Sequence, residues 1–363
     1  MGVACTLVTS PATFEAVAPR GYEVSSLFFR SLQGPLGPML RHRGRLRQIV
    51  KAISYPRGVW RAFRELREQE PGVFHIHFAI SPVLDALLAR ALRRRGWRVV
   101  YTLQEPQPEG VWSRWQYGRL MATCDVIVMH DESLAVSLRR MFPDCARKIT
   151  SLTHGMDLPQ LPSESDRERS RSSLGVAPNQ PLLLFFGMMK PYKGLEELLD
   201  AMPAVLARVP EARLCIAGEP LMDMRGVMKR ISALPAESVI LQLGFVPQAE
   251  VGGYFAAADL VITCYREIAA SSVLLQAQAH ARPVLATRVG ALPALVDEGR
   301  CGFLAGDNLS AAIVDALADQ DRLTELGKRG RERVERLHSW EHVAAATLGL
   351  YLVTRKANAD PRR

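Results

Sequence analysis

The chain has 363 residues, 48% of them hydrophobic and 23% charged, which is ordinary for a folded α/β protein and too long for one typical core. It has no run of about 18 apolar residues, so we expect no transmembrane helix, and its weakly apolar start lacks the basic region of a secretory signal. Six scattered cysteines form no Cys-x-x-Cys pair, which argues against a zinc site or a disulfide framework and favours a reducing, cytoplasmic compartment.

The positive charge is confined to the first half of the chain. Residues 1–157 hold 22 Lys and Arg against 13 Asp and Glu, which accounts for the whole formal charge of +9, whereas residues 158–363 hold 24 of each. The excess is densest in 41–51 and 90–98. Such patches suit nucleic acid, anionic lipid or an anionic substrate, although either could equally be a solvated helix face. No motif and no interleaving of aromatic with basic residues favours nucleic acid.

In chain order, the first half alternates short apolar strands with helices, which predicts a parallel sheet with helical crossovers. The expected strands are 4–9, 22–29, 72–78, 97–103, 125–129 and 148–152. The expected helices are 46–68, interrupted near Pro56, then 83–95, 111–122 and 133–141. Ligands bind such sheets beyond the carboxyl ends of the strands. Four polar residues are expected there: Gln104, Glu105, His130 and His154.

Two histidines, His75 and His77, share one face of an expected strand. A metal site would need further ligands, so we interpret the pair as a satisfied strand end beside a cleft.

A polar segment rich in Ser, Pro and charged residues, 158–180, is expected to be a hinge with one short helix, after which the alternation restarts. The expected strands are 181–186, 212–217, 238–242, 260–263 and 284–287, and the expected helices are 195–208, 251–257, 271–280, 309–337 and 339–353, the last capped by Ser339.

The stretch 259–302 organises this second half. A strand, a loop, a helix capped by Ser271 or Ser272 and a further strand after Pro283 make one βαβ unit. The free N–H groups and the positive dipole end at the start of that helix suit a phosphate. We therefore expect this unit to hold a nucleotide diphosphate.

Two consecutive βαβ halves would fit a dehydrogenase, but no Gly-x-Gly-x-x-Gly follows any strand. Residues 180–352 instead resemble the nucleotide-sugar domain of the family 4 glycosyltransferases. The matching strings, in family order, are LLLFFGMMKPYKGLEELLDAM, ARLCIAGEP, VILQLGFVPQAEVGGYFAAADLVITCYRE, LLQAQAHARPVLATRVGALPALVDEGRCGFLA and HSWEHVAAATLGLYL. The first half resembles the family more loosely, through HIHF, VVYTLQEP, CDVIVMHDES and KITSLTHGMD.

The resemblance implies the GT-B fold, which has two Rossmann-like α/β domains with a cleft between them and a C-terminal helix that crosses back to the first. It implies an acceptor-binding domain at 1–157, a hinge at 158–180, a nucleotide-sugar-binding domain at 181–338 and a return helix at 339–356. The implied reaction moves a hexose from a UDP- or GDP-sugar to a lipid-linked or other glycan acceptor, with retention, in polysaccharide or glycoconjugate biosynthesis. No metal or other cofactor is expected.

Negative charge builds up on the leaving diphosphate of such a donor, so the site must hold that charge with fixed cations and N–H dipoles. The resemblance implies that Lys193, in the PYKG loop, pairs with the diphosphate, and we expect its side chain to be exposed. Met188 stands where the family usually has Arg, and Lys190 is the substitute cation. Further donor contacts are implied for Gly187, Gly218, Phe245 and Val246.

A YR…SG-type subset of the family is resembled by Tyr265, Arg266 and Ser271, with Ser272 in place of the glycine. Arg266 is implied to contact the diphosphate, or else to form a surface salt bridge. Of the family's paired glutamates, one falls one residue from Glu267. The second falls at Gln276, whose amide can still hydrogen-bond a ribose hydroxyl.

On the acceptor side, Gln104 and Glu105 stand where family members often have His-Asp. Gln104 cannot titrate and so cannot be a general base, which leaves His130 and His154 as alternatives that are each more often structural. Three rivals remain open: an inverting transferase with Glu105, Glu109 or Asp131 as its base, a sugar-nucleotide-binding partner protein with little activity, and a nucleic-acid-binding protein, which only the charge suggests. A lipid-linked acceptor would bring the basic half to an anionic inner membrane leaflet as a peripheral protein.

Overall fold

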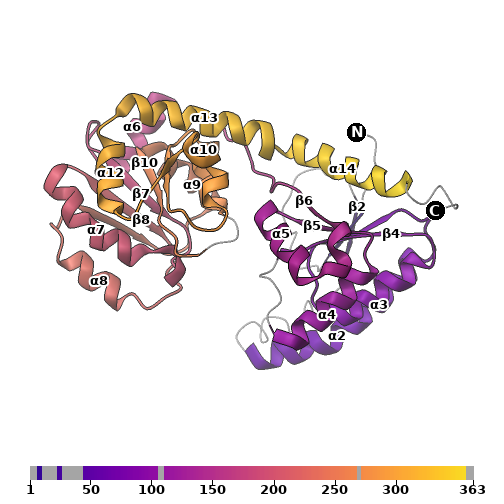
Figure 1. Ribbon diagram of the computed structural model, residues 1–363. Helices are drawn as coiled ribbons and strands as arrows, with labels where there is room; N and C mark the ends of the chain where they lie inside the picture. Colours follow the sequence, from indigo (N-terminus) through magenta and orange to yellow (C-terminus); the bar gives the residue numbers. More distant parts are fainter. Residues whose placement is uncertain (1–5, 10–22, 27–43, 105–109, 268–270, 357–363) are drawn as a thin grey trace. The chain divides into compact units, whose positions relative to one another are not determined.

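The computed structural model describes residues 6–9, 23–26, 44–104, 110–267 and 271–356 (Figure 1). The chain divides into two compact units, one made of 1–151 with 350–363 and the other of 152–349. Each unit has its own parallel sheet and its own apolar cores. Within the described residues, every helix is too short or too polar to cross a bilayer.

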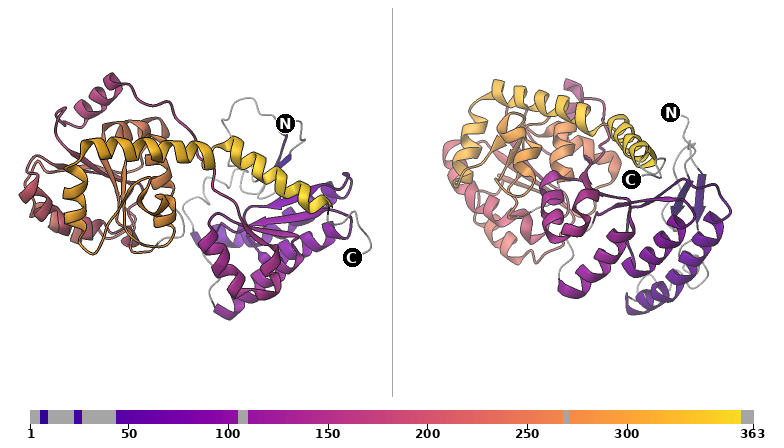
Figure 2. Two further views of the ribbon diagram at one scale, coloured as in Figure 1. Left: turned by 45° about the horizontal axis from the view of Figure 1, so that its top comes forward. Right: turned by 45° about the vertical axis from the view of Figure 1, so that its right-hand side comes forward.

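The first unit is built on a four-stranded parallel sheet in the order β3-β4-β5-β6. Its strands are β3 (Val73–Ile76), β4 (Arg98–Thr102), β5 (Val126–Met129) and β6 (Ile149–Ser151), and a separate parallel pair is formed by β1 (Thr6–Thr9) and β2 (Glu23–Ser26). The helices are α2 (Gly44–Leu66), α3 (Pro82–Arg93), α4 (Gly110–Thr123) and α5 (Glu132–Met141), with the 3-10 turn η3 (Pro143–Lys148). Figure 1 and Figure 2 show α2, α3 and α4 side by side on one face of this sheet.

One helix of the first unit differs from its prediction, because α2 runs unbroken through Pro56. Pro56 is exposed, whereas its neighbour Tyr55 is buried and donates a hydrogen bond to Asp85 of α3. One turn and more further on, Ala62 and Leu66 pack against α3 in a shared apolar cluster. Packing on α3 therefore outweighs the hydrogen bond that a proline removes from a helix.

The second unit contains a six-stranded parallel sheet in the order β12-β11-β10-β7-β8-β9. Its strands are β7 (Leu182–Phe186), β8 (Arg213–Gly218), β9 (Val239–Leu243), β10 (Leu260–Thr263), β11 (Val284–Ala286) and β12 (Phe303–Leu304). Its helices are α6 (Glu164–Ser173), α7 (Leu195–Arg208), α8 (Arg225–Ser232), α9 (Gln248–Ala257), α10 (Ser272–Ala279), α11 (Leu292–Leu295), α12 (Leu309–Leu317) and α13 (Gln320–His338), with the 3-10 turns η4 (Pro191–Lys193) and η5 (Asp297–Gly299).

Two apolar cores cover the two faces of this sheet, because successive residues of a strand point to opposite sides. On β7, Leu183 and Phe185 pack with α7 and α12, whereas Leu182 and Leu184 pack with α9 and α10. Since both faces are covered, β7 reads as an unbroken apolar run rather than an alternating one.

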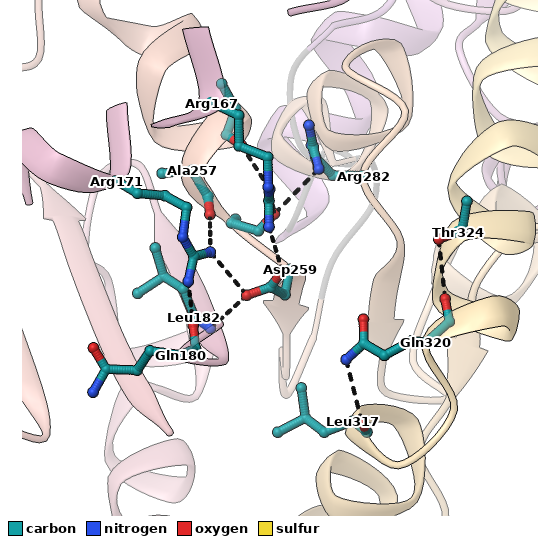
Figure 3. Close-up of polar contacts among 12 residues, drawn as sticks. Arg167, Arg171, Gln180, Leu182, Ala257, Asp259, Arg282, Leu317, Gln320 and Thr324 are labelled. Atoms are coloured by element: carbon teal, nitrogen blue, oxygen red, sulfur yellow. Dashed lines mark hydrogen bonds and ion pairs between the residues drawn. The ribbon is translucent and has the colours of Figure 1, made fainter. Parts of the chain in front are cut away.

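The segment expected to be a hinge, 158–180, is counted with the second unit and carries α6. Arg167 and Arg171 of α6 both form ion pairs with Asp259, which directly precedes β10 (Figure 3). Asp259 also accepts a hydrogen bond of 2.8 Å from the backbone N–H of Leu182, at the start of β7. These contacts hold α6 against the amino edge of the sheet.

The long helix predicted over 309–337 is two helices, α12 and α13. Asp319 ends the continuity because its carboxylate accepts a 2.9 Å hydrogen bond from the N–H of Arg322 and so caps α13. The next helix, α14 (Trp340–Lys356), begins as predicted after Ser339, whose hydroxyl accepts from the N–H of His342 at 3.3 Å. The last residues of α14 are counted with the first unit.

Candidate functional site

The strand order of the second sheet places its topological switch point between β7 and β10. The chain leaves β7 toward β8 and β9 on one side and then returns to β10 on the other side. In an open parallel sheet, the loops after two such strands diverge and leave room for a ligand at the carboxyl edge. The loop after β7 carries Lys193, and the loop after β10 carries Tyr265, so both predicted site segments lie at this switch point.

Two glycines lie back to back where β7 and β8 end. Gly187 has φ 96° and donates its N–H to the carbonyl of Ala217 at 2.8 Å, while Gly218 has φ 142°. A Cβ built on Gly218 would lie 2.2 Å from the carbonyl oxygen of Gly187, closer than any real contact. Both positions therefore need glycine, for backbone angle and for space, and they leave the strand ends open to a ligand.

Lys193 is buried, and this corrects the expectation that its side chain is exposed. Only 7% of the residue is accessible. Its ammonium lies 5.6 Å from the centre of the Tyr265 ring, and a Cβ built on Gly187 would lie 3.3 Å from its Nζ. Burial, with a smaller effect of the positive charge of Lys190, lowers the pKa of Lys193 to about 8. Among the described residues, no carboxylate forms an ion pair with it.

The backbone around Lys193 is fixed by the strand next to it. Gly194 has φ 72°, and a Cβ there would lie 2.0 Å from the carbonyl oxygen of Cys264. The Cys264 thiol donates to the carbonyl of Gly194 at 3.1 Å. This close approach of the two loops holds Lys193 over the site and requires a glycine at position 194. Sequence analysis had not singled out Gly194 or Cys264, although the glycine directly after the lysine was the available signal.

The start of α10 faces the same spot. Ser271 is its cap, as one of the two predicted candidates, because its hydroxyl accepts from the N–H of Leu274 at 3.2 Å. The side chain of Ser271 also hydrogen-bonds Tyr265, the pKa of which is raised by burial. Val273, in the first turn, lies 3.3 Å from a Cβ built on Gly187. The structure thus brings together Gly187, Lys193 and the N-terminus of α10, where free N–H groups favour an anion.

Arg266 does not point a free guanidinium into this site. It is exposed and forms ion pairs with Glu197 and, at 3.9 Å, with Glu196, both in the first turn of α7. Its own N–H donates to the carbonyl of Tyr192 at 2.7 Å. Of its two sequence interpretations, the structure shows the surface salt bridge. Glu267 beside it is exposed, and the residues that follow it, 268–270, lie outside the described part.

The remaining predicted donor residues lie on the loops and on the helix around the switch point. The N–H of Gly244 donates to the carbonyl of Gly218 at 2.9 Å, which places Phe245 and Val246 beside the end of β8. Phe245 is 80% exposed, whereas Val246 is partly buried against a core. The other residues of this group are half-buried Gln276, exposed Ser272, half-buried Lys190 and exposed Met188. A flat, exposed ring at this edge can stack on a planar base.

In the first unit, polar side chains gather at the carboxyl edge of β3 and β4. His75 forms hydrogen bonds through Nε2 to the hydroxyl of Thr102 at 2.7 Å and through Nδ1 to the hydroxyl of Tyr351 at 2.6 Å. Its ring stacks on that of His77 at 4.1 Å. Burial, followed by the nearby His77 and His130, lowers the pKa of His75 to about 3. His75 is therefore neutral at physiological pH and ties the end of α14 to the sheet.

The predicted acceptor-side residues fall in different places. His130 follows β5 in the first unit, whereas His154 is counted with the second unit, where its carbonyl accepts from His338 Nδ1 at 2.9 Å. Asp131 caps α5 by accepting from the N–H of Ser133 at 2.8 Å, which is a structural role. Gln104 is exposed after β4. Glu105 and Glu109 lie outside the described residues.

In the part of the chain that the structure describes, no group of three or more His, Cys, Asp or Glu residues is arranged so that it could hold a metal ion.

Two family models match the chain. One, described as Glycosyltransferase Family 4, matches residues 2–160, and one, described as Glycosyl transferases group 1, matches residues 180–320. The D-inositol 3-phosphate glycosyltransferases of Segniliparus rotundus and Corynebacterium efficiens are 29% and 30% identical over 249 and 290 residues. These matches cover 67% and 72% of this chain but 55% and 65% of the relatives, so the chain spans little more than half the length of the first.

Two solved structures share the architecture. Anabaena Alr3699/HepE in complex with UDP has a TM-score of 0.70 at 17% identity, covering 96% of this chain and 100% of that one. Sucrose-phosphate synthase from Thermosynechococcus elongatus has a TM-score of 0.64 at 23% identity, covering 84% and 78%. At such low identity the likeness shows the fold. The fold is GT-B, and the two family matches, one on either half, show that the chain belongs to glycosyltransferase family 4.

Proposed function

We propose that this chain transfers a hexose from a UDP- or GDP-sugar to a lipid-linked or other glycan acceptor, with retention of configuration. The observation that carries the proposal is Lys193, a buried cation at the switch point with a lowered pKa and no ion-pairing carboxylate among the described residues. A buried charge is costly unless it is paired. A diphosphate placed between Lys193, Gly187 and the start of α10 would supply the missing countercharge.

The chemistry of such a site is electrostatic. As the bond between sugar and phosphate breaks, charge develops on the leaving diphosphate, and a preorganised cation in a desolvated site stabilises it strongly. Lys193 supplies the cation, with Lys190 as a second, and the N–H groups of α10 supply dipoles. Phe245 and Val246 would receive the base, and Gln276 a ribose hydroxyl. The solved complexes of Anabaena Alr3699/HepE with UDP and with UDP-glucose support a donor of this class.

The acceptor is proposed to be taken by the first unit. All of the net positive charge lies in residues 1–157, which favours an anionic acceptor such as a lipid-linked glycan phosphate. A small phosphorylated polyol is the second candidate, because the relatives that match are named D-inositol 3-phosphate glycosyltransferases. Of the three carboxylates that an inverting reaction could use, Asp131 is engaged as a helix cap, whereas Glu105 and Glu109 lie outside the described residues.

The test is calorimetry with UDP, GDP and inorganic phosphate, followed by transfer assays with the base that binds. We expect one nucleoside diphosphate to bind far more tightly than phosphate, and nuclear magnetic resonance of the product to show the anomeric configuration of the donor. Failure to bind any nucleoside diphosphate would overturn the donor site. If the donor binds but is neither transferred nor slowly hydrolysed, the result would instead favour the sugar-nucleotide-binding partner protein.

A further inference from the structure

An apolar and cationic face on α3 and α4 is not used by the donor site. In α4, three large apolar side chains in the first two turns are exposed: Val111 by 88%, Trp112 by 68% and Trp115 by 44%. The opposite side of α4 is buried through Leu120 and Met121. Large apolar residues rarely gather on a solvent-facing stripe unless that stripe contacts something.

The stripe continues into cations along the helix. Trp112, Trp115 and Arg119 are spaced i, i+3 and i+7, so they share one side of α4. The rings of Trp112 and Trp115 stack at 4.9 Å, and the guanidinium of Arg119 lies 5.0 Å from the centre of the Trp115 ring. Arg114 is also exposed, and α4 contains no acidic residue.

The neighbouring helix repeats the pattern. On α3, Leu87 is 56% exposed, and Arg90 and Arg94 follow it at i+3 and i+7, both exposed. The acidic residue of α3, Asp85, is buried and accepts from Tyr55. Since α3 and α4 pack together and both return from the carboxyl edge of a parallel sheet, they run in the same direction. On each helix, exposed apolar side chains are therefore followed, toward the carboxyl end, by exposed arginines.

The denser basic clusters do not supply this face by themselves. Within 90–98, Arg93 forms an ion pair with Asp125 at 2.9 Å, and Arg95 donates to the carbonyl of Arg67. These two guanidiniums are engaged by the protein. The side chains of 41–51 lie outside the described part of the chain. The exposed arginines that follow the apolar side chains on α3 and α4 are Arg90, Arg94 and Arg119.

We propose that the α3–α4 face, defined by Leu87, Arg90, Arg94, Val111, Trp112, Trp115 and Arg119, is a docking surface for an anionic lipid bilayer. Tryptophan settles at the boundary between headgroups and acyl chains, because its ring is apolar and its N–H polar. Arginines beside it reach lipid phosphates, and the two together give reversible binding without a membrane span. The surface deepens the acceptor side of the proposed function, since a lipid-linked acceptor resides in such a bilayer.

The experiment uses the full chain and vesicles of phosphatidylcholine alone or mixed equally with phosphatidylglycerol, without donor or acceptor. We expect sedimentation with the anionic vesicles only, weakening as salt rises. Replacing Trp112 and Trp115 by Ser should lower the partition coefficient by about tenfold or more, because two large rings lose their apolar contact. A matched control, Met228→Ser, removes an exposed apolar side chain from α8 and should change nothing.

The arginines are tested at equal charge. Replacing Arg90, Arg94 and Arg119 by Ser should lower binding by roughly tenfold or more and flatten its salt dependence. The control triple replaces Arg208, Lys229 and Lys328 of the second unit, which are also exposed, by Ser and should leave binding as it is. Brominated phospholipid should quench the tryptophan emission of the wild-type chain, and less so that of the Trp112, Trp115 variant.

Three results would overturn the docking surface. The wild-type chain could fail to bind anionic vesicles at low salt. Alternatively, the tryptophan variant could bind them as well as wild type does, which would show that charge alone explains the binding. The tryptophan variant could also raise KM for a water-soluble acceptor while vesicle binding stays unchanged, which would make the face an acceptor subsite. If the wild-type chain binds vesicles but not UDP, the result would instead contradict the proposed transferase and not the docking surface.

Discussion

At the amino edge of the second sheet, arginines surround Asp259 (Figure 3). At the carboxyl edge, Lys193 is buried without a carboxylate partner among the described residues. Every nitrogen of the Arg171 guanidinium is hydrogen-bonded, for example to the carbonyl of Ala257 at 2.9 Å and that of Ala177 at 2.7 Å. Among the described residues, the ammonium of Lys193 lies close to the ring of Tyr265 and to Gly187 and forms no ion pair with a carboxylate.

The difference separates cations that hold the fold together from one that is available to a ligand. A buried cation whose hydrogen bonds and countercharge are all supplied by the protein is committed to structure. A buried cation that lacks a countercharge lowers the stability of the empty protein, and an anionic ligand recovers that loss on binding. The burial of the cation does not distinguish the two edges of the sheet, but the number of its hydrogen-bonding and ion-pairing partners does.

The largest effect should come from Asp259→Asn, which keeps the shape and removes the charge shared by Arg167 and Arg171. The buried guanidinium of Arg171 and the partly buried one of Arg167 then lack a countercharge, and the free energy of unfolding should fall by roughly 3–5 kcal/mol in urea denaturation. UDP affinity of the folded protein should stay the same. Glu237→Gln is the control, since Glu237 pairs with Arg213 at 3.2 Å but is 90% exposed, and it should cost less than about 1 kcal/mol. An equal loss in both variants would contradict the comparison.

The opposite pattern is expected for Lys193→Met, which keeps the stem against Tyr265 and removes the ammonium. A charge-assisted hydrogen bond contributes about 1.5–3 kcal/mol, so UDP affinity should fall by roughly 10- to 100-fold in calorimetry. Stability should hold or rise, because a desolvated charge is gone. Lys190→Met, at a half-buried neighbour, should weaken binding less. Unchanged UDP affinity in the folded Lys193 variant would remove it from the site.

A pH dependence follows from the lowered pKa of Lys193, which burial and Lys190 bring from 10.5 to about 8. UDP affinity should fall as the pH rises through 8, by up to about tenfold per pH unit, because the empty site then loses its proton. Between about pH 8 and 10.5 the unfolded chain binds more protons than the folded chain, so the free energy of unfolding should rise with pH across that window. This gain in stability is lost again as the pH falls back through the window to 8.

The control for that titration is Lys193→Arg, because a guanidinium stays charged throughout the range. It should bind UDP with little change between pH 7.5 and 9.5, where the phosphates no longer titrate, their pKa being about 6. A wild-type affinity that is equally flat would show that Lys193 is not the group that meets the diphosphate.

Helices and strands that are determined by a local pattern of apolar residues could be predicted from the sequence. The helix at 195–208 and the strand at 260–263 coincide with α7 and β10, because apolar spacing alone determines them. Two kinds of element escaped. The strand β12 has two residues, too few for a pattern, and α8 has eight residues, of which Val227 alone is buried. The break before Asp319 depends on a cap that competes with a continuous apolar period.

The candidate site divides in the same way. The family resemblance identified Gly187 and Gly218, and both have backbone angles in the structure that favour glycine. The burial of Lys193 could not be predicted, because it depends on Cys264 and Tyr265, which are about seventy residues away in the chain. The engagement of Arg266 by Glu197 likewise depends on α7 lying beside the end of β10. Contacts between distant segments are a property of the fold and leave no mark in a local pattern.

The smallest effect is expected for Gln276→Glu on α10. Gln276 is half-buried, and its amide is proposed to face a ribose hydroxyl. A carboxylate accepts a stronger hydrogen bond than an amide, so UDP affinity in calorimetry should hold or rise, by no more than roughly fivefold.

The same substitution two residues further on is the matched control. Gln278 is fully buried, and its Nε2 donates to the carbonyls of Leu295 at 3.1 Å and Cys301 at 3.3 Å. Gln278→Glu would set a carboxylate against two carbonyl oxygens and should lower the melting temperature strongly, since a buried charge would lack any donor. The two glutamates thus distinguish a ligand-facing position from a core position on one helix. If Gln276→Glu folds but binds no nucleotide, position 276 belongs with position 278, and α10 presents another side to the donor.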